Sequence, residues 1–331
     1  IGGDGSDVLV GGPDDGLPGT DADVAVFEGS KGSYEFGVDA LSGSLTVTSK
    51  DTGSVDILEG IETLSFGDGP LTVSRPSSDA AFTLTGSDGA DDVIEVQSEI
   101  GFVLEGASGA DTLIGGSGDD TLIGGGGDDV FVVDGGEDVI DGGAGRDALD
   151  FSASVAGVQV DLSAGTLVDG EGFEDQFSSI EIVTGSDATD TLVGSEDADT
   201  LIGGGGDDTL IGGGGDDVVD GGLGDDVLEL DGSVGVTAEG GGGTDTVQLV
   251  GETNDASLSG VETVSGSTGD DDLTITTNDI QSVSGGEGFD AVTLTDADGN
   301  TVELDGVEVI TGSGGADTLT VTDDTLSLIH I

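Results

Sequence analysis

The sequence predicts an all-β protein, a parallel β-solenoid in which short strands alternate with glycine-rich turns. Three observations lead to this fold class: a nine-residue phrase returns in unbroken register, the 67 glycines follow the same period, and Leu, Ile and Val recur at fixed places within it. Collagen is excluded because it needs glycine at every third position. No long helix is expected, since Gly, Asp, Thr and Val all have low helix propensity.

The repeated phrase has the form G-G-x-G-x-D-x-U-x, where U is a large aliphatic residue. Copies that follow one another at nine-residue steps are unlikely to arise by chance, so the chain is read first as a repeat protein. A first block of copies begins at Gly106, Gly115, Gly124 and Gly142, with a degenerate copy at Gly135–Ile140; a second begins at Gly185, Gly194, Gly203, Gly212 and Gly221; isolated copies begin at Gly2, Gly86, Gly240, Gly266, Gly285 and Gly312.

Each phrase encodes one tight turn and one short strand. In the copy at 203–211, Gly203, Gly204 and Gly206 are expected to reach positive φ without a Cβ clash. The following Thr-Leu-Ile forms a strand whose alternation sends Leu210 toward the interior. Two phrases make a flattened coil of eighteen residues, so copies eighteen apart lie on one edge and their aliphatic residues stack into a narrow core.

The charge balance is extreme, with 71 acidic residues against 4 basic ones and a net charge of −67. This balance disfavours nucleic acid and anionic membranes as partners. Acidic chains are often disordered, but here 34% of residues are apolar and regularly placed, which favours a fold. The absence of Cys excludes a disulfide framework. No apolar stretch approaches the length of a membrane span, so no membrane insertion by this fragment is expected.

Stacked coils bring the sixth-place carboxylates close together. At a separation of about 5 Å, set by the ~4.8 Å strand spacing, a bare pair costs about 0.8 kcal/mol in water and about 3 kcal/mol at an effective dielectric of 20. Calcium removes this repulsion, because it accepts six to eight carboxylate and carbonyl oxygens in a flexible geometry. Magnesium demands a tighter octahedron, and zinc prefers His and Cys. We therefore predict several Ca²⁺ ions that are part of the fold.

The phrase is similar to the nonapeptide of RTX (repeats-in-toxin) proteins. The resemblance implies a right-handed parallel β-roll that binds calcium in its glycine-rich turns, with sixth-place carboxylates as ligands and glycine carbonyls assisting. The implied carboxylate ligands are Asp111, Asp120, Asp129, Asp147, Asp190, Asp199, Asp208, Asp217 and Asp226. The implied glycine positions are Gly106, Gly115, Gly124, Gly203, Gly212 and Gly221.

Several positions depart from the pattern. Ser195, Glu196 and Asp197 follow Gly194 and remove a glycine turn, and Arg146 places a positive charge beside Asp147. The fifth-place aspartates are expected to be solvated or to lie outside the direct ligand set: Asp119, Asp128, Asp207, Asp216 and Asp225. The aspartates of the isolated copies have no obvious partner eighteen residues away: Asp7, Asp91, Asp245, Asp271, Asp290 and Asp317.

A second phrase, aliphatic-Glu-x-aliphatic, recurs between the blocks, and its alternation predicts strands. It occurs at Ile61–Leu64, Ile180–Val183, Val261–Val264 and Val307–Ile310. We interpret these stretches as degenerate coils of the same solenoid rather than separate globular domains.

The predicted organisation follows from these patterns, and the chain is interpreted as a fragment truncated at both ends. The last six residues, LSLIHI, are interpreted as a non-native, adapter-encoded tail, the alternative being a genuine apolar C-terminus. The segments are 1–19, a partial nonapeptide repeat; 20–69, a strand-rich segment; 70–85, a linker or loose coil; 86–150, a first calcium-binding block; 151–184, degenerate coils; 185–232, a second calcium-binding block; 233–325, a degenerate solenoid with isolated repeats; and 326–331, the tail.

No catalytic residues are expected in this fragment. The sequence has no HExxH, GxSxG or Cys/His pair, and Lys31, Lys50, Arg75 and Arg146 are scattered. Paired carboxylates also serve glycosidases, but here the repeat period explains their positions. The outward Ile114, Ile123, Ile202 and Ile211 are interpreted as ordinary strand residues rather than a ligand-binding face. Ice binding is disfavoured because there is no regular outward Thr ladder.

Two functional hypotheses remain. The first is a calcium-dependent folding and stabilising module of a secreted protein, which includes the case of a non-catalytic module of a hydrolase or toxin whose catalytic domain is missing. The second is a stalk segment of a large surface adhesin or matrix protein. The resemblance implies export from a Gram-negative bacterium by a type I secretion apparatus, a secreted or cell-surface location, and a cell-surface or extracellular matrix partner. The sequence upstream would discriminate between these hypotheses.

Overall fold

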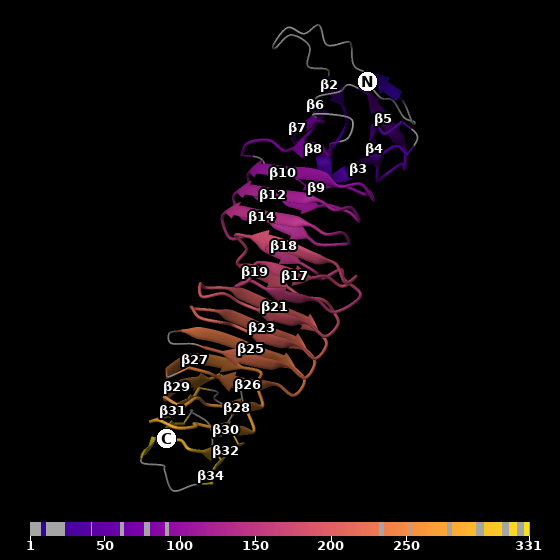
Figure 1. The fold of residues 1–331 in the computed structure, drawn as a ribbon. Helices are drawn as coiled ribbons and strands as arrows, with labels where there is room; N and C mark the ends of the chain where they lie inside the picture. The colour runs from indigo at the N-terminus through magenta and orange to yellow at the C-terminus, as the bar shows by residue number, and fades with distance from the viewer. Residues whose placement is uncertain are drawn as a thin grey trace. The chain divides into compact units, whose positions relative to one another are not determined.

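The computed structural model describes most of the chain and divides it into two compact units, residues 1–150 with 166–180 and residues 151–165 with 181–331 (Figure 1). Residues 1–7, 11–23 and 323–327, among others, lie outside the described part. The described ranges are 8–10, 24–40, 42–59, 63–75, 80–89, 93–231, 235–251, 253–276, 280–295, 301–312, 318–322 and 328–330.

The first unit begins with short, mainly antiparallel strands. Strand β4 pairs antiparallel with β3 and β5, and β1 lies parallel to β5. Beside them, an aromatic cluster includes Phe27 and Phe66, whose ring centroids are 5.3 Å apart. The fully buried Lys31 forms an ion pair of 3.6 Å with Asp68. The elements are β1 (Val8–Val10), η1 (Lys31–Ser33), β3 (Tyr34–Val38), β4 (Leu45–Ser49) and β5 (Val55–Glu59).

The rest of the first unit consists of two sheets, and from β8 to β15 successive strands of the chain alternate between them. From β8 onward, neighbours in each sheet pair in parallel, and the exception is the antiparallel β17–β18 hairpin. One sheet holds β2 (Val24–Val26), β6 (Thr63–Phe66), β7 (Gly69–Ser74), β8 (Phe82–Thr85), β10 (Phe102–Ser108), β12 (Thr121–Gly126), β14 (Val139–Ala144), β17 (Thr166–Val168) and β18 (Glu174–Ser178). The other holds β9 (Val93–Glu95), β11 (Thr112–Ile114), β13 (Val130–Val132) and β15 (Ala148–Asp150).

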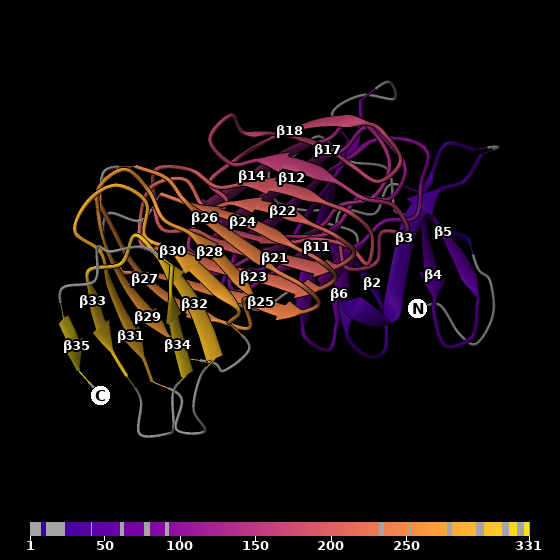
Figure 2. The ribbon, with the colours of Figure 1, turned by 90° about the horizontal axis from the view of Figure 1, so that it is seen from below.

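The second unit is a parallel solenoid of the same design, and Figure 2 shows its strands side by side in successive coils. Every described pairing between its strands is parallel. One sheet holds β16 (Gln159–Asp161), β20 (Thr191–Val193), β22 (Thr209–Ile211), β24 (Val227–Leu230), β26 (Thr246–Leu249), β28 (Thr263–Ser265), β30 (Ser282–Ser284), β32 (Thr301–Asp305) and β34 (Thr318–Val321). The other holds β19 (Ile182–Thr184), β21 (Thr200–Gly205), β23 (Val218–Leu223), β25 (Val236–Gly242), β27 (Thr253–Ser259), β29 (Asp270–Ile275), β31 (Ala291–Leu294), β33 (Val309–Thr311) and β35 (Leu328–His330). The prediction of an all-β, parallel solenoid is confirmed.

The core consists of columns of buried side chains, most of them aliphatic, that the strands of both sheets contribute. Leu192 pairs with Leu210, and Leu210 with Leu228, in register across three coils, and all three are fully buried. The outward neighbours do not form a continuous apolar ladder. Ile211 lies beside Val193 in one neighbouring coil but beside Glu229 in the other, and Ile202 lies beside Asp220. Burial is therefore confined to one side chain in two, as expected for strands with one buried face.

The glycine turns require glycine for two different reasons. Gly204 and Gly206 have φ of +102° and +110°, which confirms the predicted left-handed backbone at these positions. The same prediction for Gly203 is wrong, since its φ is not positive. There, glycine is needed for space, because a Cβ on Gly203 would lie 2.5 Å from the Asp208 Oδ2 atom.

The aliphatic column predicts a clear difference between two neighbouring positions. Replacing the buried Leu210 with Ala should lower the free energy of unfolding in saturating calcium by about 2–5 kcal/mol, because it leaves a cavity. Ile211→Ala, on the half-exposed face of the same strand, serves as the control and should cost much less. Denaturant unfolding of the variants measures both values; equal losses would contradict the assignment of the core.

Candidate metal centre

The sixth-place aspartates lie where each glycine turn enters its strand. Asp208 directly precedes β22, and Asp217 directly precedes β23. Burial at these positions is nearly complete, with no predicted ligand carboxylate more than 2% exposed. The buried set contains every carboxylate predicted as a ligand: Asp111, Asp120, Asp129, Asp147, Asp190, Asp199, Asp208, Asp217 and Asp226.

Most of these carboxylates accept a hydrogen bond from the coil before them. In the second unit, the Asp190 N–H donates to Asp208 Oδ1 and the Asp208 N–H donates to Asp226 Oδ1, both at 2.8 Å. The opposite edge repeats the contact between Asp199 and Asp217 at 3.0 Å. In the first unit, the same 2.8 Å contact links Asp111 to Asp129, Asp129 to Asp147, and Asp120 to Asp138. We call each such run a carboxylate column.

The second oxygen of the carboxylate faces a small space beside the first glycine of its own phrase. A Cβ added to Gly221 would lie 2.5 Å from Asp226 Oδ2 and 2.6 Å from the Gly240 carbonyl oxygen. The two oxygens therefore line a cradle that one methyl group would fill. Within the nonapeptide blocks, this second oxygen is buried and accepts no hydrogen bond in Asp111, Asp120, Asp129, Asp147, Asp208 and Asp226.

The first-place glycines contribute to these cradles in two ways. Carbonyl oxygens of later copies lie beside the Cβ position of the glycine one coil earlier: Gly124 beside Gly106, Gly203 beside Gly185, Gly212 beside Gly194, and Gly221 beside Gly203. For Gly106 and Gly115, the structure shows the close approach of their own aspartate; a Cβ on Gly115 would lie 2.5 Å from Asp120 Oδ2. Glycine at the first place is thus what allows carboxylate and carbonyl oxygens to share one space.

The donor set of a cradle fits a calcium ion. A cradle such as that at Gly203 or Gly221 offers hard oxygen donors, an aspartate Oδ2 and a glycine carbonyl from the next coil, and calcium accepts such mixtures. Among the described residues, no group of three or more His, Asp or Glu side chains could hold a metal by itself. An ion in the cradle would therefore depend on backbone oxygens as much as on side chains. It would supply the positive charge that the buried carboxylates lack.

Some copies fill the cradle with a serine hydroxyl instead. Ser195 donates its N–H (2.6 Å) and its hydroxyl (2.8 Å) to Asp199 Oδ2, so this oxygen has protein partners. Ser186 makes the same contacts with Asp190, its N–H donating to Oδ2 at 2.6 Å. The serine follows the first glycine in both phrases. The turns at Gly185 and Gly194 therefore differ from the all-glycine turns at Gly203 and Gly212.

The fifth-place aspartates point outward and bond in the opposite direction along the stack. Asp207 Oδ1 accepts the N–H of Asp225 at 3.0 Å, and Asp225 Oδ1 accepts the N–H of Thr244 at 2.8 Å, each from the following coil. In the first unit, Asp128 accepts the N–H of Arg146 at 2.9 Å. All of the fifth-place side chains are exposed. Neighbouring aspartates in one phrase thus have separate roles.

The columns extend beyond the predicted ligands. Asp138 donates its N–H to Asp175 Oδ1 at 2.7 Å although the two are 37 residues apart, because the β17–β18 hairpin returns to the same edge. Asp226 bonds to Asp245 across 19 residues, and Asp271 to Asp290 across 19. Asp138 belongs to the degenerate copy at Gly135–Ile140, and Asp245, Asp271 and Asp290 belong to isolated copies, so the repeat pattern marks them in the sequence. Their partners in these bonds are not predicted, because those partners do not lie eighteen residues away. Asp7, Asp91 and Asp317 lie outside the described residues.

Burial changes the protonation of these carboxylates. Loss of solvation raises the pKa of Asp120 and Asp208 to about 7 and that of Asp138 to about 8, with neighbouring aspartates adding to the effect. Backbone N–H groups that donate to the carboxylates oppose the shift. Without a cation, the columns therefore favour protonated aspartates near neutral pH.

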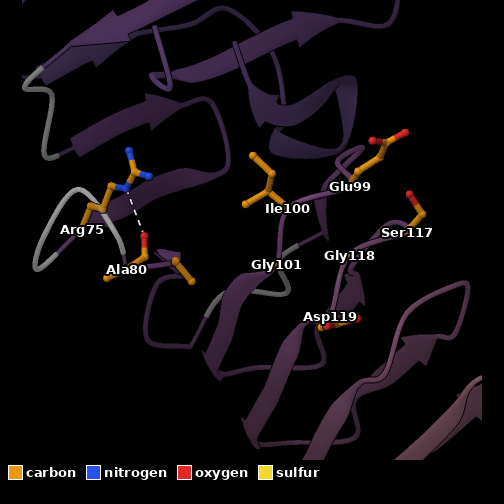
Figure 3. A pocket seen from close by; sticks show the side chains of 9 residues that line it. Arg75, Ala80, Glu99, Ile100, Gly101, Ser117, Gly118 and Asp119 are labelled. Atoms are coloured by element: carbon orange, nitrogen blue, oxygen red, sulfur yellow. Dashed lines mark hydrogen bonds between the residues drawn. The ribbon is translucent and has the colours of Figure 1, made fainter. Parts of the chain in front are cut away.

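A separate hollow of about 410 Å³ lies beside the turn that ends at Asp119 (Figure 3). Arg75 is directed away from acidic partners there, since its Nε donates to the Ala80 carbonyl at 3.0 Å and its guanidinium carbon lies 4.4 Å from the centre of the Phe82 ring. The hollow lies outside the carboxylate columns and adds no oxygen to their cradles.

Comparison with known protein families agrees with this geometry. The model described as RTX calcium-binding nonapeptide repeat (4 copies) matches residues 105–139, 123–153, 184–219, 193–228 and 304–325. These stretches are RTX calcium-binding nonapeptide repeats. The matched ranges contain the predicted ligand aspartates of both RTX blocks. None of the curated proteins compared with the chain matches it.

The two adjacent aspartates of one RTX phrase predict a matched pair of variants. Asp208→Asn keeps an acceptor for the Asp190 N–H but removes charge from a buried cradle, so the calcium concentration needed for folding should rise tenfold or more. Asp207→Asn removes the same charge from the exposed side and should shift that midpoint by less than twofold. Calcium titrations followed by circular dichroism compare the two; equal shifts would contradict the assignment.

The raised pKa values predict an acid-induced fold in calcium-free protein. The pKa of an unfolded Asp is about 3.9, whereas that of folded Asp208 is about 7. The folded state therefore binds more protons in this interval, and its stability is lost as the pH rises from about 4 through about 7. Calcium-free protein should gain β structure on acidification through this window, measured by circular dichroism. Loss of structure on acidification would be the opposite result.

Proposed function

We propose that this region is a structural module whose β-solenoid folds when calcium ions occupy the carboxylate columns. The observation that carries the proposal is the set of buried Oδ2 atoms without a hydrogen-bond partner, several of which, as in Asp129, Asp208 and Asp226, lie beside a glycine carbonyl. Such oxygens are costly to bury unless a cation or a proton compensates them. In this proposal the predicted sixth-place aspartates and first-place glycines are the ligand set.

The energetic balance explains why the fold would depend on the ion. Stacked, mostly aliphatic side chains from the two sheets form the core of the solenoid, while the net charge is −67. A GGGGDDxUx phrase carries two negative charges, and one shared divalent ion per stacked turn neutralises them. A bound ion supplies charge neutralisation and a link between coils. Because the cradle exists only in stacked coils, the free energy of calcium binding becomes free energy of folding.

We further propose that the module works outside the cell. Extracellular calcium-binding modules have dissociation constants of about 10⁻⁴–10⁻³ M, so they fill only where calcium is abundant. RTX repeats are typical of secreted proteins, which supports this location and export by a type I apparatus. No helix in the described part of the chain has the length and apolar character that a membrane span needs. A solenoid built of repeats is consistent with a non-catalytic module.

A calcium titration of the whole chain tests the proposal. Circular dichroism should show a coil in calcium-free buffer at pH 7.5 and a β-rich chain in millimolar calcium, because the ions offset the repulsion within the columns. Magnesium at the same concentration is the control and should produce little structure, since it keeps its octahedral water shell. A β-rich spectrum that does not respond to chelator would overturn the proposed function.

A further inference from the structure

The Glu-containing phrase occurs twice in the second unit as Gly-Val-Glu, at residues 260–262 and 306–308. Both turns follow the last aspartate of a carboxylate column. Asp245 ends the column that starts at Asp190, and Asp290 follows Asp271 on the other edge. In each case the next coil has Glu where the column would continue with Asp.

The glutamate makes the hydrogen bond that a sixth-place aspartate would make. The Asp245 N–H donates to Glu262 Oε2 at 2.7 Å, and the Asp290 N–H donates to Glu308 Oε2 at 2.8 Å. These distances match the 2.8 Å of the Asp208–Asp226 contact in the RTX block. The column is therefore closed by a carboxylate at both places.

The glycine of the same phrase replaces the first-place glycine of a nonapeptide. Its backbone is left-handed, with φ of +57° at Gly260 and +66° at Gly306. Its carbonyl oxygen lies beside the Cβ position of Gly240 and Gly285, respectively, where the aspartate Oδ2 atom also lies. The carbonyl and the carboxylate therefore come from the first and third residues of Gly-Val-Glu. In a nonapeptide they come from the first and sixth residues. The longer Glu side chain suits this shorter turn.

A related turn in the first unit supports the carbonyl half of this arrangement. Ser179 precedes Ile180 and Glu181, and its φ of +58° is unusual for a residue other than glycine. Its carbonyl oxygen lies beside the Cβ position of Gly142, which is 2.7 Å from Asp147 Oδ2. The left-handed turn with an inward carbonyl therefore recurs in a different sequence context.

Both proposed sites contain a buried oxygen that lacks a protein partner. Asp245 is fully buried and Asp290 is 1% exposed, and the Oδ2 atom of each accepts no hydrogen bond. Val261 and Val307 are each 2% exposed and fix the turn to the core. Asp245, Glu262 and Asp290 lie outside the ranges that match the RTX model.

We propose that each Gly-Val-Glu turn completes a calcium site with one Asp and one Glu, formed by Asp245, Gly260 and Glu262 at one place and by Asp290, Gly306 and Glu308 at the other. This proposal rests on the proposed function, since it assigns further ions to the same columns. It extends the calcium-binding region past the nonapeptide blocks and gives the second phrase a chemical role.

Hydrogen exchange of the full chain, measured by mass spectrometry across a calcium titration, tests the site at 245–262. Glu262→Gln keeps an oxygen that accepts the Asp245 N–H but removes the charge. It should raise the calcium midpoint for protection of β26 and β28 tenfold or more, while the midpoint for β22 and β24 stays unchanged. Glu239→Gln, at an exposed position on β25, removes the same charge and is the matched control.

The outcomes are distinguishable. A midpoint for β26 and β28 in Glu262→Gln within twofold of that in Glu239→Gln would overturn the proposal. In Glu262→Gln, β26 and β28 could stay unprotected at every calcium concentration. The number of calcium ions bound per chain then tests the site: one ion fewer than in Glu239→Gln supports the proposal, and an equal number overturns it. Wild-type protein without calcium-dependent protection at β22 and β24 would instead refute the proposed function.

Discussion

Successive coils of this protein are joined by a buried carboxylate that accepts the backbone N–H of the preceding aspartate, as Asp226 does from Asp208. The contact fixes the spacing of the coils and brings negative charge into the interior. It also leaves a carboxylate oxygen without a protein donor in cradles such as those of Asp208 and Asp226. The need for glycine at the first place of the phrase follows from this one constraint, and so does the proposed dependence on a cation.

The paired aspartates of each phrase are explained by two opposite bonding directions. The inner carboxylate reaches back to the coil before it, and the outer one accepts an N–H from the coil after it, as Asp208 and Asp207 show. One of the pair is buried and has no water to stabilise its charge, while the other is solvated. In the Asp-Asp sequence, the exposed fifth-place aspartate therefore makes a structural contact with the next coil. The buried sixth-place aspartate brings a carboxylate oxygen into the interior.

Much of the fold could be predicted from the sequence because its period encodes the geometry. The nine-residue phrase placed Leu210 in the core and Asp208 and Asp226 on one edge, and the structure confirms both. The pairing of Asp138 with Asp175, and of Asp226 with Asp245, could not be read from an eighteen-residue template, because a hairpin or one extra residue intervenes. The sequence does not show whether a glycine is present for its positive φ or for its lack of a Cβ atom. The left-handed backbone predicted for Gly203 is therefore wrong, although glycine is required there. The serine hydroxyls at Asp190 and Asp199 depend on rotamers that no spacing predicts.

The link between Asp138 and Asp175 has a wider meaning for how such chains diversify. The bond needs only that two strands meet in register. The bonded residues can be 17 positions apart in the sequence, as Asp245 and Glu262 are, or 37 positions apart, as Asp138 and Asp175 are. Additional residues can therefore be inserted in the turn of a coil without changing how the neighbouring coils pair. A rigid scaffold of this kind tolerates variation at its margins, where natural drift or deliberate grafting could add recognition loops at little cost to the framework.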